Sequence, residues 1–104
     1  MTTLKNIKAN GGATLNANGE AVNYNKGYQV SIKDLYIMPV YKMTKKFIKT
    51  LLNDKYNLGL WIDNNKVYID YSVNIKTKKE AVKVGKANNQ ISIWNWKKMD
   101  CIYL

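Results

Sequence analysis

The chain has 104 residues, enough for one domain whose single hydrophobic core needs no disulfide or metal. Its formal net charge is +10, from 17 basic residues that are all lysine, 7 acidic residues and no histidine. The single cysteine, Cys101, excludes an intrachain disulfide and is typical of a reducing cytosol. No apolar run approaches the roughly 18 residues of a membrane span, so a cytoplasmic location is expected.

The N-terminal third predicts a short helix followed by a β-meander. Thr2 or Thr3 can cap a helical turn within residues 1–12, which the glycine pair Gly11-Gly12 would end. An Asn-Gly pair between alternating runs predicts a hairpin over 13–24. A second turn would then lead into a strand from Tyr28, so residues 1–33 form the predicted meander.

Residues 34–104 predict the order strand, helix, strand, strand, helix, strand. These elements are expected over 34–41, 43–57, 58–63, 66–75, 77–90 and 100–104, and "DNN" is expected to join the strands over 58–63 and 66–75 as a hairpin. Thr44 and Thr77 are the expected N-caps, and Glu80 has the spacing of a capping box. Because Pro39 lacks an N–H, its strand should lie at an edge or end near Pro39.

This order is that of a ferredoxin-like β-α-β-β-α-β unit, a mostly antiparallel sheet with two helices on one face. The predicted fold is therefore α+β, as a single domain over 1–104 with the meander preceding this unit. One core is expected to contain Phe47, Leu51, Ile62, Val67, Ile69, Val84 and Ile102.

Strand alternation assigns side chains to two faces of the predicted sheet. The face under the helices would carry Leu35, Ile37, Leu60, Ile62, Val67, Ile69, Tyr71, Val73, Ile102 and Leu104. The other face would carry Tyr36, Met38, Trp61, Tyr68 and Tyr103. Such an aromatic face either stacks unpaired bases, as in RNA-recognition modules, or is buried under the meander. Burial is favoured, because the strand over 66–73 has no glycine and carries Asp70.

The candidate binding residues are the lysines of both helices and the segment around the last tryptophan. They are Lys45, Lys46, Lys49, Lys79, Lys83, Lys86, Trp96, Lys97 and Lys98. Lysine neutralises phosphate as a point charge and lacks the planar fork with which arginine reads guanine, so any nucleic-acid contact should be nonspecific. An AT-rich coding sequence is an alternative explanation for so many lysines.

Two tryptophans near the C-terminus, Trp94 and Trp96, share a strand parity. We expect Trp94 to be in the core and Trp96 to be partly exposed beside Lys97 and Lys98. This difference requires the strand to end or turn between the two tryptophans.

Catalysis finds little support in the sequence, which lacks histidine for acid–base chemistry. Asp63 and Asp70 could approach each other across a hairpin and hold a metal or act as acid and base, although a solvated turn is more typical. Cys101 has no base near it in sequence and is expected to be a small apolar filler. No enzymatic activity, cofactor or metal is predicted.

Three segments, "GGATLNANGEAVNYNKGYQVS", "GLWIDNNKVYIDYSV" and "NQISIWNW", together resemble a small protein family of phages and mobile elements from low-GC Gram-positive bacteria. The resemblance implies an anti-defence role, in which a small anti-CRISPR-like protein occludes a host defence protein or ribonucleoprotein complex in the host cytoplasm. A lysine-rich face would engage the guide RNA or nucleic-acid channel. The alternatives are a nonspecific nucleic-acid-binding accessory protein of replication or transfer and, less favoured, a small-ligand binder or enzyme.

Overall fold

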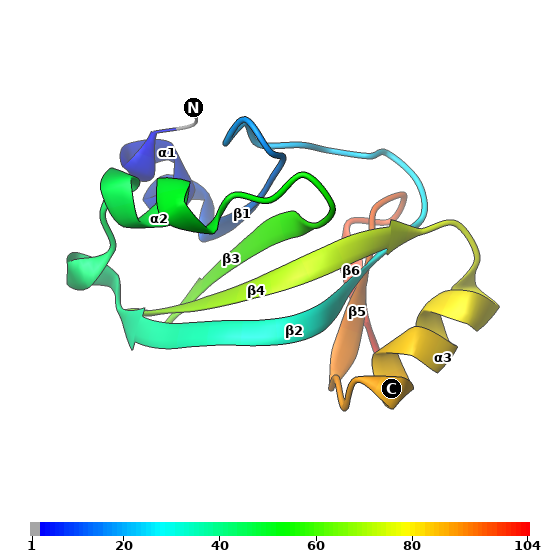
Figure 1. Ribbon diagram of the computed structural model, residues 1–104. Helices are drawn as coiled ribbons and strands as arrows, with labels where there is room; N and C mark the ends of the chain where they lie inside the picture. Colours follow the sequence, from blue (N-terminus) through cyan, green and yellow to red (C-terminus); the bar gives the residue numbers. More distant parts are fainter. Residues whose placement is uncertain (1–2) are drawn as a thin grey trace. The chain divides into compact units, whose positions relative to one another are not determined.

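The computed structural model describes residues 3–104, which form an α+β fold with one six-stranded sheet of order β1-β3-β4-β2-β5-β6 (Figure 1). The helices are α1 (Leu4–Asn10), α2 (Lys45–Leu51), α3 (Lys78–Ala87) and the 3-10 helix η1 (Val40–Lys42). The strands are β1 (Gly12–Leu15), β2 (Tyr28–Pro39), β3 (Asn57–Asp63), β4 (Lys66–Ile75), β5 (Ser92–Asn95) and β6 (Asp100–Tyr103). No helix within this described part is long and apolar enough to cross a bilayer.

Contacts divide the chain into two compact units. Unit 1 contains the described residues up to Val22 together with Asp34–Tyr71, and unit 2 contains Asn23–Lys33 with Ser72–Leu104. The long strands β2 and β4 each supply residues to both units. The predicted boundary after residue 33 coincides with one point at which the chain changes unit, and folding as a single domain stays a prediction.

The N-terminal helix is confirmed, but the meander is wrong. The Thr3 hydroxyl accepts from the Asn6 N–H, and Gly11 ends α1 in the left-handed region with φ 75°; the alternative cap, Thr2, lies outside the described residues. β1 pairs antiparallel with β3, and β1 and β2 are not neighbours in the sheet. The predicted hairpin over 13–24 is present only in short form, with one bridge between Leu15 and Ala21. Positive φ angles at Asn25 and Gly27 then interrupt the extended chain before Tyr28.

Two predicted strand segments form one strand, β2, which lies between β4 and β5 rather than at an edge. Of the two outcomes predicted for Pro39, an edge strand or the end of a strand, the second is confirmed, because β2 ends at this proline. The next N–H, that of Val40, donates to the Asn65 carbonyl at 2.9 Å. Asn64 and Asn65 both have positive φ in the tight turn of the confirmed β3–β4 hairpin. With β1 and β6 at its ends, the sheet is not a simple ferredoxin-like sheet.

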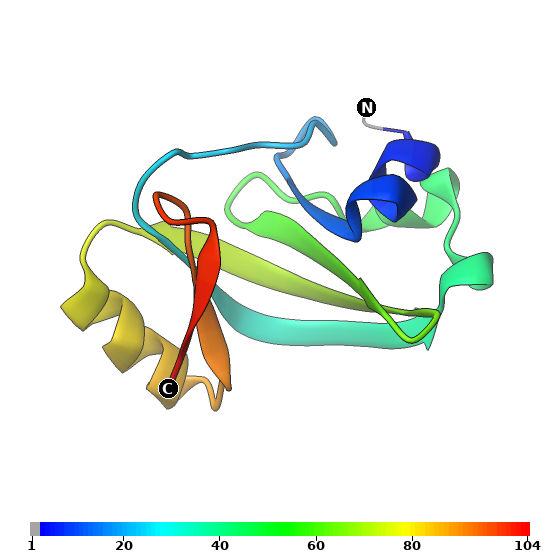
Figure 2. The same ribbon diagram turned by 180° about the vertical axis from the view of Figure 1, so that it is seen from behind.

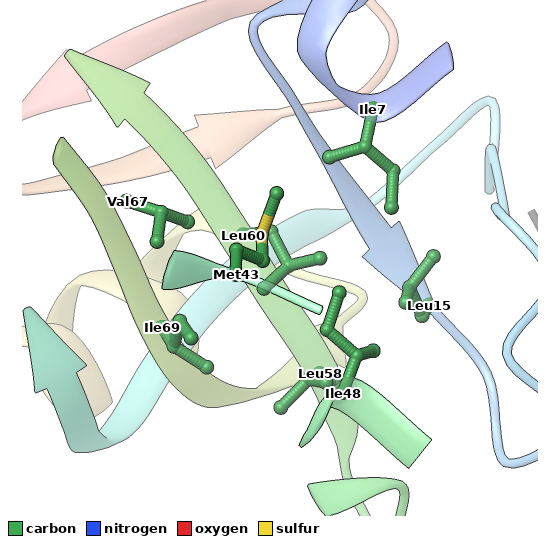
Figure 3. Packing of buried hydrophobic residues seen from close by; sticks show 8 residues of the cluster. All are labelled: Ile7, Leu15, Met43, Ile48, Leu58, Leu60, Val67 and Ile69. Atoms are coloured by element: carbon green, nitrogen blue, oxygen red, sulfur yellow. The ribbon is translucent and has the colours of Figure 1, made fainter. Parts of the chain in front are cut away.

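The core of unit 1 lies between one face of its strands and the helices α1 and α2 (Figure 3). Its buried side chains are Ile7, Leu15, Met43, Ile48, Leu58, Leu60, Val67 and Ile69. The Thr44 hydroxyl caps α2 by accepting from the Phe47 N–H at 3.1 Å. α2 ends earlier than predicted, because the Asn53 side chain accepts from the Lys55 and Tyr56 N–H groups and holds a turn there.

Unit 2 has its own core, in which α3 covers Val30 of β2 and Ile93 of β5. Ala81 and Gly85 are buried, and a Cβ at Gly85 would lie 2.7 Å from Leu104 Cδ1, so glycine permits close packing of the helix. The predicted single core is therefore wrong: Val84 and Ile102 pack in unit 2, and the other predicted members pack in unit 1. Ile37 was also misplaced, since its side chain is exposed.

Candidate polyanion-binding surface

The positive charge of the protein is concentrated in unit 2. Unit 2 has nine lysines against two carboxylates, a net +7, whereas unit 1 has eight against five, a net +3, which together account for the total of +10. All nine lysines of unit 2 are exposed: Lys26, Lys33, Lys76, Lys78, Lys79, Lys83, Lys86, Lys97 and Lys98. Unit 2 is thus the more favourable surface for a polyanion.

Helix α3 presents three of the predicted binding lysines on one side. Thr77 caps this helix by accepting from the Glu80 N–H, as predicted. Lys79, Lys83 and Lys86 are exposed, opposite the buried Ala81 and Gly85. Their spacing of four and then three residues places neighbouring Cβ atoms about 5–6 Å apart. They form a row of like charges that a line of phosphates could neutralise.

The other predicted helix lysines belong to unit 1. Lys45, Lys46 and Lys49 are exposed on α2 and line a hollow together with Thr50. The candidate lysines of the two helices therefore fall in different units.

The β5–β6 hairpin holds the remaining pair of predicted lysines at its turn. β5 ends at Asn95, whose buried side-chain Oδ1 accepts from the N–H groups of Lys97 and Lys98 at 3.1 and 3.3 Å. Met99 completes the turn with φ 53°. Both lysine side chains are exposed, as predicted, on a turn that these hydrogen bonds fix.

The prediction for the two tryptophans is the wrong way round. Trp96 is only 7% exposed, and its indole Nε1–H donates to Gln29 Oε1 at 3.0 Å. Its ring meets those of Tyr24 and Trp94 edge to face, at centroid distances of 5.8 and 6.2 Å. Trp94 keeps intermediate exposure. The strand does end between the tryptophans, but the turn packs Trp96 against Gln29 and Tyr24, which are too distant in sequence to have indicated this.

The outward face of unit 1 is open where burial was predicted. Trp61 is 63% exposed, and its ring lies 5.6 Å from that of the half-buried Tyr68. The N-terminal segment does not cover this face, because it extends the sheet edge as β1. Gly12 is the residue of β1 opposite Trp61 and has no side chain to shield the indole.

The two aspartates considered as a metal or acid–base pair do not meet. The contact between the Trp61 and Tyr68 rings indicates that these two residues face each other across the β3–β4 hairpin. Asp70 therefore lies over Gly59, whereas Asp63 lies next to the turn at the end of the hairpin. Among residues 3–104 no group of three or more potential ligands could hold a metal ion. Cys101 is exposed on β6 opposite Trp94, so the prediction of an apolar filler is wrong.

No protein-family model, curated protein or solved structure matches this chain. The charge and the exposed side chains of each unit are therefore the basis for a functional proposal.

Proposed function

We propose that the protein is a non-enzymatic binding protein that inhibits a host defence complex by stoichiometric occlusion, as anti-CRISPR proteins do. The observation that supports this role is the net +7 of unit 2, with every lysine of the unit exposed. A surface of this kind gains affinity for nucleic acid by releasing condensed counterions, without reading sequence. The host partner is a protein or ribonucleoprotein complex whose nucleic-acid channel or guide RNA the lysines of α3 would approach.

A ferredoxin-like core belongs to the same proposal. In this proposal the neighbours β3-β4-β2-β5 would be the four strands of such a unit, and β1 and β6 would be additions at the two ends. Within unit 2, the strands would support α3 and the β5–β6 hairpin.

The second candidate is a nonspecific nucleic-acid-binding accessory protein of replication or transfer. The same exposed lysines favour it, because they would neutralise phosphates of free nucleic acid equally well. The two functions differ in the partner: an inhibitor binds a host complex more tightly than it binds naked nucleic acid.

A matched pair of triple variants tests the proposal. Lys79→Gln with Lys83→Gln and Lys86→Gln removes three charges from unit 2, and Lys45→Gln with Lys46→Gln and Lys49→Gln removes three from unit 1. Host ribonucleoprotein captured by the wild-type protein and identified by mass spectrometry would be titrated with both variants over a range of salt concentrations. The unit 2 variant should bind more weakly, with a salt dependence flatter by about 0.7–0.9 log units per lost phosphate contact.

The control variant should bind nearly as the wild type does. Unchanged affinity of the unit 2 variant would overturn the proposal, since its lysines would then be only a solvated face. Binding to naked nucleic acid as tight as binding to the host complex would favour the accessory protein instead.

A further inference from the structure

The β5–β6 hairpin, orange and red in Figure 2, carries the half-buried Trp94, the exposed Tyr103 and two exposed lysines at its turn. The side of the hairpin from which Trp94 projects is called its outer side. Trp94 pairs with Cys101 and Ser92 pairs with Tyr103, so all four side chains project from the same side of the hairpin. Tyr103 is 77% exposed. Diagonal neighbours such as Trp94 and Tyr103 lie about 7–8 Å apart in an antiparallel pair, close enough for successive bases of one strand.

The other side of this hairpin is already occupied. Ile93 and Ile102 form the opposite parity and pack in the core with Ala81 of α3. The outer side is partly covered near the turn, where Trp96 and Tyr24 pack edge to face. Tyr103, at the far end of β6, remains outside that cover.

The charges around the hairpin suit an anion. Asp100 pairs with Asn95, so its side chain projects from the side of the hairpin that faces α3. Glu80, the other acidic residue of unit 2, lies on α3 itself. The outer side of the hairpin therefore carries no side-chain carboxylate from unit 2, while Lys97 and Lys98 are exposed at its turn. Proteins that bind single-stranded nucleic acid combine aromatic rings, on which bases stack, with positive charge along the backbone.

The aromatic pair of unit 1, the exposed Trp61 and the half-buried Tyr68, has a carboxylate on its own face of the sheet. Trp61 and Tyr68 share their face with Asp70, which lies over Gly59. A carboxylate beside the rings repels phosphate, so this pair is a poor nucleic-acid platform and a suitable internal control.

We propose that the outer side of the β5–β6 hairpin binds an unpaired nucleic-acid strand. Tyr103 stacks on one base, and Trp94 contacts the next base of the same strand. Lys97 and Lys98 bind phosphates at the turn. The inference rests on the proposed function, because it names the unpaired strand as the part of the nucleic-acid-containing partner that unit 2 contacts. Duplex is disfavoured, since its bases are stacked inside and offer no face to Tyr103.

The test uses fluorescence anisotropy with the full chain and three labelled probes. These are oligouridylate and oligothymidylate of about 12 nucleotides, within the site sizes of single-strand-binding modules, and a duplex of equal length. The variants are Tyr103→Ala, Tyr103→Phe, Lys97→Gln with Lys98→Gln, the triple α3 variant Lys79→Gln with Lys83→Gln and Lys86→Gln, and the control Trp61→Ala. Urea unfolding of each variant checks that the fold is intact, which the exposure of Tyr103 favours.

The wild type should prefer at least one single strand to duplex. Tyr103→Ala should weaken that binding about 5- to 150-fold, the effect of losing one base–aromatic stack. Tyr103→Phe keeps the ring and should bind like the wild type, as should Trp61→Ala; the double lysine variant should weaken binding and flatten its salt dependence.

The inference fails, and the proposed function stands, if the lysines of α3 are needed for binding but Tyr103→Ala binds normally. The same holds if those lysines are needed but duplex binds as well as single strands. If no probe binds, or if none of the lysine variants loses affinity in a salt-dependent way, the inference is overturned. The proposed contact of unit 2 with nucleic acid is then overturned as well.

Discussion

The indole Nε1–H of Trp96 donates a 3.0 Å hydrogen bond to Gln29 Oε1, and both side chains are buried. The nitrogen of the same amide makes a second hydrogen bond, since Gln29 Nε2 donates to the buried Ser72 hydroxyl at 2.9 Å. One glutamine thus satisfies polar groups from the β5–β6 turn and from β4 within unit 2. Buried polar groups are expensive when unpaired, so this amide fixes the position of the turn that carries Lys97 and Lys98.

Replacing Gln29 with alanine should therefore destabilise unit 2. The Trp96 N–H and the Ser72 hydroxyl would each lose a buried partner, at about 1–3 kcal/mol per group. Urea unfolding should show this loss. Gln90→Ala is the control, because the Gln90 amide donates to a single carbonyl, that of Asn88, and should cost less. Equal losses for both variants would show that the buried amide has no special role.

Truncation in the unit 1 core should separate buried from exposed aliphatics. Leu58 is fully enclosed by its neighbours in the core, and Leu58→Ala should lower the free energy of unfolding by about 2–5 kcal/mol. Ile37, which sequence alternation placed in the core, is 67% exposed. Ile37→Ala should change the free energy by no more than about 0.5 kcal/mol. A large loss at Ile37 would mean that its side chain is covered in solution.

Local signals in the sequence were sufficient to predict most helices and strands. Caps at Thr3, Thr44 and Thr77 and the Asn64-Asn65 turn are set by neighbouring residues, and all are confirmed. The exposure of the helix lysines followed from helical spacing in the same way.

Features that depend on distant pairing could not be predicted. The pairing of β1 with β3 joins segments far apart in the chain, and it decides that the face of Trp61 stays open. The burial of Trp96 depends on Gln29 and Tyr24, which lie far from it in the sequence. Strand parity alone could not distinguish Trp94 from Trp96, because the turn after Asn95 breaks the alternation.

The pairing of β1 with β3 makes a prediction for two adjacent glycines. Gly11 has φ 75°, and a methyl group on its Cα would meet only open space, so Gly11→Ala should cost only the left-handed backbone, about 1–2 kcal/mol. Gly12 has φ 147°, and a Cβ there would collide with the Leu60 carbonyl. Gly12→Ala should cost about 2–5 kcal/mol, because backbone strain and overpacking add. Equal losses in urea unfolding would argue against close contact of β1 and β3 at this point.

The three tryptophans should differ in their access to solvent, and this difference tests the side-chain packing within each unit. Variants that keep one tryptophan each, with phenylalanine at the other two positions, isolate the emission of Trp61, Trp94 and Trp96. Acrylamide is a suitable quencher because it is neutral and the lysines do not attract it. Trp61 should emit furthest to the red and be quenched most readily, since it is 63% exposed.

Trp96 should emit furthest to the blue and resist quenching, and Trp94 should lie between the other two. Phenylalanine at position 96 removes the donor to Gln29, so the unfolding midpoint of each variant must accompany its spectrum. Trp96 quenched as readily as Trp61 in a folded variant would mean that the β5–β6 turn releases its ring in solution. The outer side of the hairpin would then offer an exposed indole beside Lys97 and Lys98.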